Sequence, residues 1–269
     1  MKAIITGAGR GGIGGAVSLR LAREARRRGE KTKLVLCGSG RRIEETEALA
    51  DEVRAEGALV ALMCGDLANP SLPGKIIEEA LEFCGGLDLV VSNAGLPASA
   101  PLAEISLESW ETLFAVHTRA AWLLARSAYP ALKQSRGCFI ATGSVSGTVP
   151  HPMNGAYCAA KAALIMLCET LALEWGPDGI RVNVVSPGSV KTPITQPYFT
   201  DPEVMSSRQA EIPLGRVAEA DEIGAVVSFL AGPGASFITG QNIVVDGGVS
   251  RISLDRIRSA GSGPKQATT

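Results

Sequence analysis

Short apolar runs alternate with helix-patterned segments along almost the entire chain. Seven runs have the length and composition of buried β-strands, at residues 2–6, 33–37, 59–64, 87–92, 138–142, 181–186 and 242–245. The segments between them space their apolar residues as helices do, as at 13–28, 44–56, 70–84, 107–134 and 156–175. Strands that alternate with helices favour a parallel sheet with both faces covered. The pattern predicts an α/β fold with a doubly wound, seven-stranded parallel sheet and helices on both faces.

The length of the chain leaves room for one large domain or two small ones. Of its 269 residues, 46% are apolar, which is ample for a buried core. No linker or internal repeat interrupts the alternation before residue 252. From there the sequence ISLDRIRSAGSGPKQATT is polar and contains Gly, Ser and Pro. We expect one domain over residues 1–251 and a polar tail over 252–269, either flexible or an arm reaching a neighbour.

Charge and cysteine content argue against several classes of protein. Lys and Arg number 26 against 27 Asp and Glu, so no basic stripe points to nucleic acid. No apolar run reaches about 18 residues and the first residues lack a signal-peptide layout, so neither a membrane span nor export is expected. Six cysteines without a CxxC pair, beside two histidines, predict no metal site and reduced thiols in the cytoplasm.

A glycine-rich stretch, TGAGRGGIG at residues 6–14, follows the first predicted strand directly. A strand, glycines and then a helix aim free backbone N–H groups and a helix dipole at a phosphate. The dinucleotide fingerprint G-x-G-x-x-G fits in two registers, as Gly7-Gly9-Gly12 and as Gly9-Gly11-Gly14. The spacing therefore predicts a Rossmann-like dinucleotide site, while a glycine turn without a ligand stays open as the alternative.

Further motifs follow the glycines in a fixed order. They are SNAG at 92–95, Ser144 after the fifth strand, Tyr157 and Lys161 as Y-x-x-x-K, SPG at 186–188 and DGG at 246–248. With this ordered set, residues 2–250 resemble the short-chain dehydrogenase/reductase family, and in particular its bacterial ketoacyl reductase-like members. The family spaces its glycine loop as T-G-x-x-x-G-x-G, one residue shorter than here. We align Gly7 and Gly12-Ile13-Gly14 with that pattern and treat Gly11 as an inserted bulge.

Tyr157 and Lys161 are one helical turn apart, so their side chains leave the same face of a helix. Transfer of a hydride to a ketone needs a proton donor at the carbonyl oxygen, and a tyrosine suits this if a nearby cation lowers its pKa. The resemblance implies that Tyr157 is the acid/base, that Lys161 lowers its pKa and grips the nicotinamide ribose, and that Ser144 polarises the carbonyl. Ser146 is a second candidate serine; the thirteen-residue step to Tyr157 favours Ser144. Taken alone, Tyr157 and Lys161 would be better explained as an ordinary i, i+4 pair on an exposed helix; Ser144 upstream and the SPG motif downstream favour the catalytic interpretation.

One position departs from the family pattern. The family usually carries Asn seven residues after the Trp of its fourth helix, and here Trp110 plus seven is His117. An imidazole that titrates near neutrality could join a proton relay at this place. The alternative is a histidine packed on a helix at a subunit face.

The turn after the second strand, CGSGRR at 37–42, holds no carboxylate, the group that binds a ribose 2′-OH in NAD-preferring proteins. Ser39, Arg41 and Arg42 supply hydroxyl and guanidinium groups suited to a 2′-phosphate, and by resemblance Arg10 matches a basic position common in NADP-using relatives, so the predicted cofactor is NADP(H). Arg41 and Arg42 could instead simply begin a solvated helix. The resemblance places the remaining cofactor contacts at Asp66 and Leu67 (adenine), Asn93, Ala94 and Gly95 (ribose), and Pro187, Gly188, Val190 and Thr192 (nicotinamide).

Substrate selection is expected from residues 194–213, which carry the proline and polar breaks of a lid and offer Tyr198, Phe199 and Met205 as lining. Relatives that act on acyl-carrier-protein substrates place arginines where Tyr129 and Leu173 stand here, which weakens that interpretation. The hypothesis is an NADPH-dependent oxidoreductase that reduces a small ketone to a secondary alcohol, or the reverse. Alternatives are an NAD-dependent dehydrogenase of a cyclic diol or hydroxy compound, and a catalytically impaired cofactor-binding subunit. The resemblance also implies a homo-oligomer, dimer or tetramer.

Overall fold

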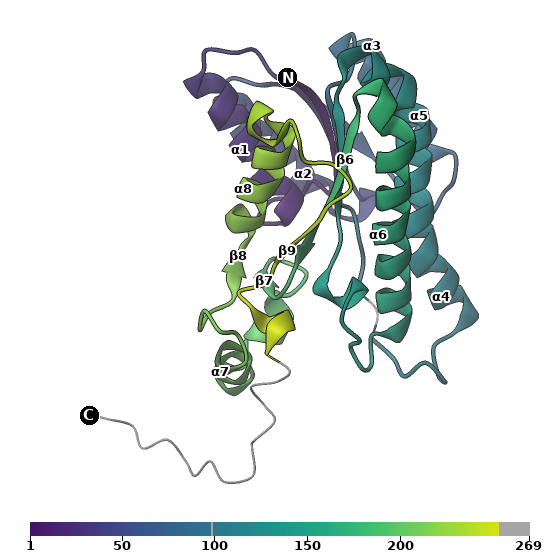
Figure 1. The fold of residues 1–269 in the computed structure, drawn as a ribbon. Coiled ribbons are helices and arrows are strands. Elements are labelled where there is room, and N and C mark those ends of the chain that lie inside the picture. Colours follow the sequence, from purple (N-terminus) through teal and green to yellow (C-terminus); the bar gives the residue numbers. More distant parts are fainter. Residues whose placement is uncertain (98, 253–269) are drawn as a thin grey trace.

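The computed structural model describes residues 1–97 and 99–252, and it contains one seven-stranded parallel sheet (Figure 1). Its strand order is β3-β2-β1-β4-β5-β6-β9. The strands are β1 (Lys2–Thr6), β2 (Lys33–Gly38), β3 (Leu59–Cys64), β4 (Leu89–Ser92), β5 (Cys138–Thr142), β6 (Arg181–Pro187) and β9 (Asn242–Val245). The predicted doubly wound α/β fold is confirmed, with all seven strands at or within two residues of their expected bounds. The polar-tail prediction, 252–269, lies outside the described residues apart from Ile252.

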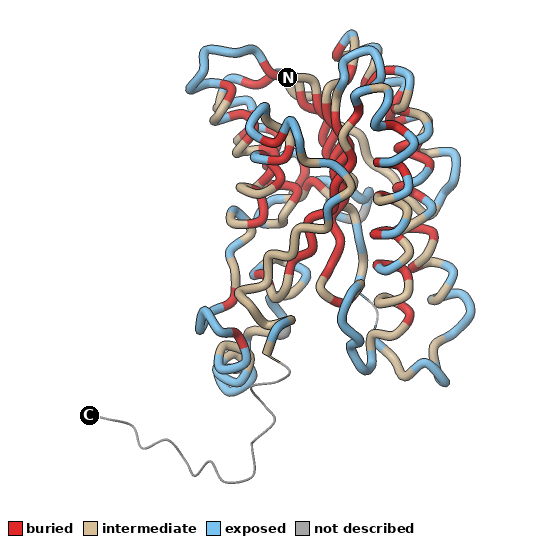
Figure 2. Tube along the Cα trace, viewed as in Figure 1, coloured by how far each residue is buried: buried red, intermediate tan, exposed pale blue. Residues whose placement is uncertain are grey.

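Helices cover both faces of the sheet (Figure 1). On one face lie α1 (Ile13–Arg27), α2 (Ile43–Ala55) and α8 (Ala220–Ala231), and on the other lie α3 (Leu72–Cys84), α5 (Ala120–Ser135) and α6 (Gly155–Trp175). Each face has its own apolar core, and Figure 2 shows the buried residues gathered in the sheet and on the inner helix sides. Strands buried on both faces explain why the sequence runs are continuously apolar and do not alternate.

The long helix expected over residues 107–134 is interrupted. It consists of α4 (Leu107–Phe114), a π-helical turn at Ala115–Arg119, and α5. The prediction of one regular helix is wrong at this turn, because periodicity cannot distinguish one widened turn from an α-helical one. A two-stranded sheet of β7 (Val190–Lys191) and β8 (Ala218–Glu219), with α7 (Pro202–Ala210) between them in the chain, was likewise not expected from the sequence.

Helix α6 is apolar on nearly all sides. By length and composition alone it could cross a membrane, and 44% of its most apolar stretch is buried inside the fold. Its buried residues, among them Leu164, Cys168 and Ala172, pack in the core of one sheet face together with Phe139 of β5. The helix therefore serves as a core helix of the α/β domain, and its apolar outer side remains exposed.

The carboxyl ends of β1 and β4 meet where the strand order changes direction, the usual place for a ligand site in such sheets. Here backbones approach closely. A Cβ atom on Gly15 of α1 would lie 2.4 Å from the carbonyl oxygen of Gly9. The glycine loop is therefore packed against the first turn of its own helix.

We expect Gly15→Ala to lower the free energy of unfolding by at least about 2 kcal/mol, because neither backbone can yield without strain. Gly74→Ala in α3 is the matched control: its Cβ would meet only Ser127 Oγ at 3.8 Å. That variant should be stabilised by about 0.5–1 kcal/mol, since alanine is the better helix former. Urea unfolding of both variants measures the contrast, and equal stabilities would contradict the packing argument.

Candidate active site

The glycine loop presents an uncapped helix start. Gly12 is the N-cap of α1, no side chain caps it, and the first turn carries no acidic residue. Gly7 has φ +65°, and a Cβ there would lie 2.8 Å from Ala94 Cα. A Cβ on Gly14 would lie 2.5 Å from the Gly7 carbonyl oxygen. Backbone N–H groups without side chains around them fit a pyrophosphate, so the residues present suit the phosphates of a dinucleotide.

Gly11 adopts φ +73°, a conformation that favours glycine, in agreement with its assignment as an inserted bulge. A Cβ at this position would lie 3.4 Å from Pro193 Cγ, so the segment after β6 passes over the glycine loop. Gly15 is also needed for packing, but sequence analysis assigned no role to it. The only sign of that role in the sequence is the pair of consecutive glycines at residues 14–15.

Asn93 joins the ends of three strands. Its Nδ2 donates to the carbonyl oxygens of Thr6 at 3.0 Å and Gly7 at 3.2 Å, and its Oδ1 accepts from Thr142 Oγ1 at 3.0 Å. Thr6 Oγ1 in turn accepts the N–H groups of Asn93 and Ala94. The predicted ribose-side residues thus hold the glycine loop and the end of β5 in fixed positions.

The structure brings Ser144, Tyr157 and Lys161 together. Ser144 follows β5 and is buried, while the other two lie in the first two turns of α6. Ser144 and Tyr157 share a hydrogen bond. Lys161 Nζ lies 5.7 Å from the centroid of the Tyr157 ring and donates to the Thr142 carbonyl oxygen at 2.7 Å. A phenol, a hydroxyl and an amine therefore converge at the carboxyl end of β5.

Burial dominates the electrostatics of this pair. It raises the pKa of Tyr157, and the hydrogen bond from Ser144 opposes the rise only in part. It lowers the pKa of Lys161 to about 7. The expectation that Lys161 lowers the pKa of Tyr157 does not hold for the protein alone. The reason is that desolvation penalises both charged forms, and the amine is bonded to Thr142 and not to the phenol.

His117 lies in the π-helical turn with its ring edge-on to Tyr157, at 5.2 Å between centroids and 88° between planes. Its Nε2 lies 3.0 Å from the Leu96 carbonyl oxygen, and its Nδ1 is buried without a partner among the described residues. Burial, and the charge of Lys161, lower the pKa of His117 to about 3. The expected titration near neutrality is therefore wrong: the imidazole is neutral at physiological pH. Gly95 leaves room for it, since a Cβ there would lie 2.7 Å from the His117 Cε1 atom.

The predicted 2′-phosphate residues lie near acidic partners. Arg10 Nε is 2.7 Å from Glu52 Oε1, and Arg42 Nη1 is 3.4 Å from Glu45 Oε2. That Glu45 oxygen also lies 3.6 Å from where a Cβ on Gly9 would be. Ser39 precedes the short helical turn Gly40–Arg42, and the side chain of Arg41 is outside the described part of the chain. The sequence missed Glu45, because its helical position two residues into α2 gave no sign that it faces the glycine loop.

The remaining predicted contacts line the same edge of the sheet. Asp66 follows β3, and its Oδ1 accepts a hydrogen bond from the Ala68 N–H at 2.9 Å. The side chain of Leu67 is partly buried and packs against the core. Pro187 ends β6, and a Cβ on Gly188 would lie 2.8 Å from Asp246 Cβ. Val190 is buried in β7, and Thr192 Oγ1 lies 3.0 Å from Thr195 Oγ1.

Comparison with known proteins places these features in one family. A family profile described as enoyl-(acyl carrier protein) reductase matches residues 7–250. The chain is 36% identical over 248 residues to the short-chain dehydrogenase/reductase eriH of Hericium erinaceus, covering 91% of this chain and 96% of that protein. The chain belongs to the short-chain dehydrogenase/reductase family.

Two further similarities agree with this membership. The chain is 34% identical over 239 residues to meso-2,3-butanediol dehydrogenase of Serratia marcescens, covering 81% of this chain and 94% of that protein. Its fold matches a crystal structure of a short-chain dehydrogenase from Burkholderia cenocepacia J2315 in complex with NADP, with a TM-score of 0.83, 29% identity, and coverage of 92% and 97%. Like its family, this short-chain dehydrogenase/reductase is an oxidoreductase that uses a nicotinamide cofactor and acts on alcohols or carbonyls.

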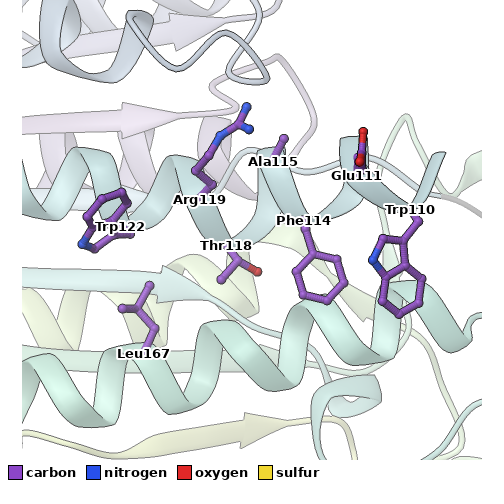
Figure 3. A pocket seen from close by; sticks show the side chains of 8 residues that line it. All are labelled: Trp110, Glu111, Phe114, Ala115, Thr118, Arg119, Trp122 and Leu167. Carbon is purple, nitrogen blue, oxygen red and sulfur yellow. The ribbon is translucent and has the colours of Figure 1, made fainter. Parts of the chain in front are cut away.

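A groove of about 630 Å³ lies away from this site, on the outer side of α4, α5 and α6. Trp110 and Phe114 of α4 stack at 5.1 Å between ring centroids, and Figure 3 shows Leu167 of α6 on the opposite side of the view from them, below Trp122. Within the described residues no cluster of three His, Cys, Asp or Glu side chains could hold a metal ion.

The predicted lid, residues 194–213, contains α7, which has no buried residue. The side chain of Tyr198 is outside the described part of the chain.

The lowered pKa of Lys161 predicts how stability depends on pH. In the unfolded chain the amine stays protonated far above pH 7, whereas the folded protein releases the proton from about pH 7 upward. With respect to this amine the unfolded state then binds more protons, so Lys161 should contribute about 1–2 kcal/mol of added stability between pH 7 and 8.5. The buried thiols of Cys37, Cys138 and Cys168 have raised pKa values and oppose the gain toward pH 8.5, equally in wild type and in Lys161→Met. Urea unfolding of both proteins across that range therefore measures the lysine as the difference between their slopes; identical slopes would contradict the assignment.

Proposed function

We propose that this short-chain dehydrogenase/reductase is an NADPH-dependent enzyme that reduces a ketone to a secondary alcohol, or catalyses the reverse reaction. The observation that carries the proposal is the convergence of the half-buried Tyr157 with the buried Ser144 and Lys161 at the end of β5, at the same edge of the sheet as the uncapped start of α1. Proton donor and phosphate cradle thus lie at one edge of the sheet. The direction of the reaction depends on the supply of reduced and oxidised cofactor.

When bound, the nicotinamide supplies or accepts the hydride. In reduction, Tyr157 Oη donates a proton to the substrate oxygen, and the Ser144 hydroxyl donates a hydrogen bond to the same oxygen as negative charge develops. The raised pKa of Tyr157 keeps the phenol protonated before the reaction. In oxidation the phenol must lose its proton, and a charged Lys161 would favour that loss.

Cofactor contacts follow the edge of the sheet. The pyrophosphate would be held by backbone N–H groups of the loop containing Gly7, Gly12, Ile13 and Gly14. We assign Asp66 and Leu67 to the adenine, Asn93, Ala94 and Gly95 to the ribose, and Pro187, Gly188, Val190 and Thr192 to the nicotinamide, with Tyr157 and Lys161 beside its ribose.

The preference for NADP(H) rests on Arg10 in the glycine loop and on Ser39 and Arg41, which follow β2. In addition, the relative from Burkholderia cenocepacia was solved in complex with NADP. A specific observation favours the alternative, an NAD-dependent dehydrogenase of a diol or hydroxy compound. Glu45 lies against the glycine loop, and both Arg10 and Arg42 are paired with carboxylates. A carboxylate there would accept hydrogen bonds from a ribose 2′-OH and repel a 2′-phosphate.

His117 is assigned a positioning role. A neutral imidazole packed edge-on against Tyr157 fixes the plane of the phenol ring. The packing of His117 against Tyr157, together with the complete set of Ser144, Tyr157 and Lys161, weighs against a catalytically impaired subunit.

We further propose a homo-oligomer in the cytoplasm, formed through the outer sides of α5 and α6. Trp122 is 42%, Met166 62% and Leu173 82% exposed there, next to the groove of Figure 3. Exposed apolar side chains on the outer side of a helix favour burial against a second copy. We keep residues 1–251 as the cofactor-binding domain.

The first test is turnover. Purified protein should oxidise NADPH in the presence of one or more members of a panel of small ketones, and Tyr157→Phe should lower kcat at least about a hundredfold, because the proton donor is lost. Tyr129→Phe is the matched control, since the hydroxyl of Tyr129, on α5, bonds Asp178 in the short turn after α6, away from the site. It should leave kcat within about twofold. Turnover that survives Tyr157→Phe would refute the proposed chemistry.

The second test is cofactor choice. Fluorescence titration should give a Kd for NADPH about tenfold below that for NADH, and Arg10→Ala should weaken NADPH about tenfold while leaving NADH unchanged, because one charge-assisted bond to the 2′-phosphate is lost. The control is Arg23→Ala, near the C-terminal end of α1. It breaks the ion pair between Arg23 and Glu56, which follows α2, and should change neither dissociation constant. Tighter binding of NADH would support the alternative enzyme.

A further inference from the structure

A cluster of polar side chains beside Ser144 is not used by the proposed reaction. Ser146, His151 and Asn154 lie in the loop between β5 and α6. Ser146 Oγ is 3.4 Å from His151 Nδ1, and Asn154 Nδ2 is 3.2 Å from the same nitrogen. Ser146 is buried, whereas His151 is exposed. The cluster therefore extends from the interior to the surface of this loop.

The cluster is connected to the proton-donating groups on both sides. The Ser146 N–H donates to Ser144 Oγ at 3.1 Å, and Asn154 is the N-cap of α6, three residues before Tyr157. A substrate whose reacting oxygen lies between Ser144 and Tyr157 has Ser146 and Asn154 as the next polar groups along the same loop.

The contacts show which hydrogen-bonding groups the cluster offers. Asn154 Nδ2, which can only donate, lies 3.2 Å from His151 Nδ1 and 3.4 Å from Nε2, so it faces the imidazole without selecting one nitrogen. Ser146 Oγ lies 3.4 Å from Nδ1, and its hydroxyl can donate and accept. The cluster therefore combines a hydroxyl, an imidazole and an amide. A hydroxyl group of a ligand, which both donates and accepts, matches that set.

The surroundings exclude charged groups as the preferred guest. Residues 144–157, SVSGTVPHPMNGAY, contain no Asp, Glu, Lys or Arg. The same loop carries the exposed apolar side chains of Val149 (40%) and Met153 (52%). From the facing loop, Leu102 packs where a Cβ on Gly155 would be, and the Ala100 N–H donates to the Met153 carbonyl oxygen at 2.7 Å. A neutral oxygen on a small apolar skeleton fits such a wall better than a carboxylate or phosphate.

We propose that Ser146, His151 and Asn154 form a second oxygen-binding site, which receives a hydroxyl or keto oxygen on the carbon next to the reacting one. The substrate class is then the vicinal diols and the corresponding α-hydroxy ketones. This inference rests on the proposed oxidoreductase function and deepens it: Ser144 and Tyr157 hold the reacting oxygen, and the cluster selects molecules that carry a second one.

The test compares substrates that differ by one oxygen. kcat/KM is measured on the full chain for 3-hydroxy-2-butanone against 2-butanone and for 2-hydroxycyclohexanone against cyclohexanone, with both NADPH and NADH. Wild type should prefer the hydroxylated member of each pair it reduces. Ser146→Ala and His151→Leu should each lower that preference about three- to tenfold, the factor for one lost neutral hydrogen bond, with 2-butanone and cyclohexanone rates nearly unchanged.

Two further variants separate binding from folding. His151→Gln keeps a donor and an acceptor and should restore most of the preference. Thr148→Val removes a hydroxyl of the same loop that bonds only the Val145 carbonyl oxygen, and it should leave the preference unchanged. Reduction of both members with no preference in wild type, or a preference that the variants do not alter, would overturn this inference alone. Reduction of no member of either pair would overturn the proposed function together with it.

Discussion

The side-chain amide of Asn93 is the interaction on which the site depends. It donates to the carbonyl oxygens that end β1 and begin the glycine loop, and it accepts from the Thr142 hydroxyl at the end of β5. The Thr142 carbonyl oxygen then accepts from Lys161. A continuous path of hydrogen bonds thus joins the phosphate-binding loop to the helix that carries the proposed acid. Because the path is partly buried at Asn93 and fully buried at Lys161, it fixes the distance between the glycine loop and the first turns of α6 more firmly than side-chain packing alone could.

The same burial sets the charge of the resting site. Tyr157 is held protonated and His117 neutral, and burial lowers the pKa of Lys161 to about 7. Desolvation thus disfavours the charged form of all three groups, which reduces the cost of unpaired charge in the site. Negative charge at the substrate oxygen arises only during the reaction, where the hydroxyl of Ser144 is already oriented by its neighbours. Electrostatic stabilisation that is arranged beforehand in this way costs no reorganisation at the moment of transfer.

The sequence was sufficient for features that repeat a local rule. Seven apolar runs predicted the seven sheet strands, and the ordered motifs predicted which loops meet at the carboxyl edge. Features that arise from contacts between distant segments were not accessible. Periodicity could not show the widened turn at Ala115–Arg119, and nothing local marked Glu45 as a neighbour of Gly9. The protonation of His117 was predicted incorrectly because its burial depends on Gly95 and Tyr157, far away in the chain.

The π-helical turn has a consequence for the register of the whole helical layer. Each residue of an α-helix rotates the following chain by about 100°, so α4 and α5 are offset in phase by the one residue that the wide turn accommodates. That offset lets α5 direct Leu124 and Leu132 into the core while His117, within the turn itself, faces the phenol. Removing one residue from this turn would make the helix regular. Either the His117 imidazole or the aliphatic face of α5 would then be rotated away from its present contacts. The irregularity is therefore what allows a single helical segment to serve both the core and the catalytic edge.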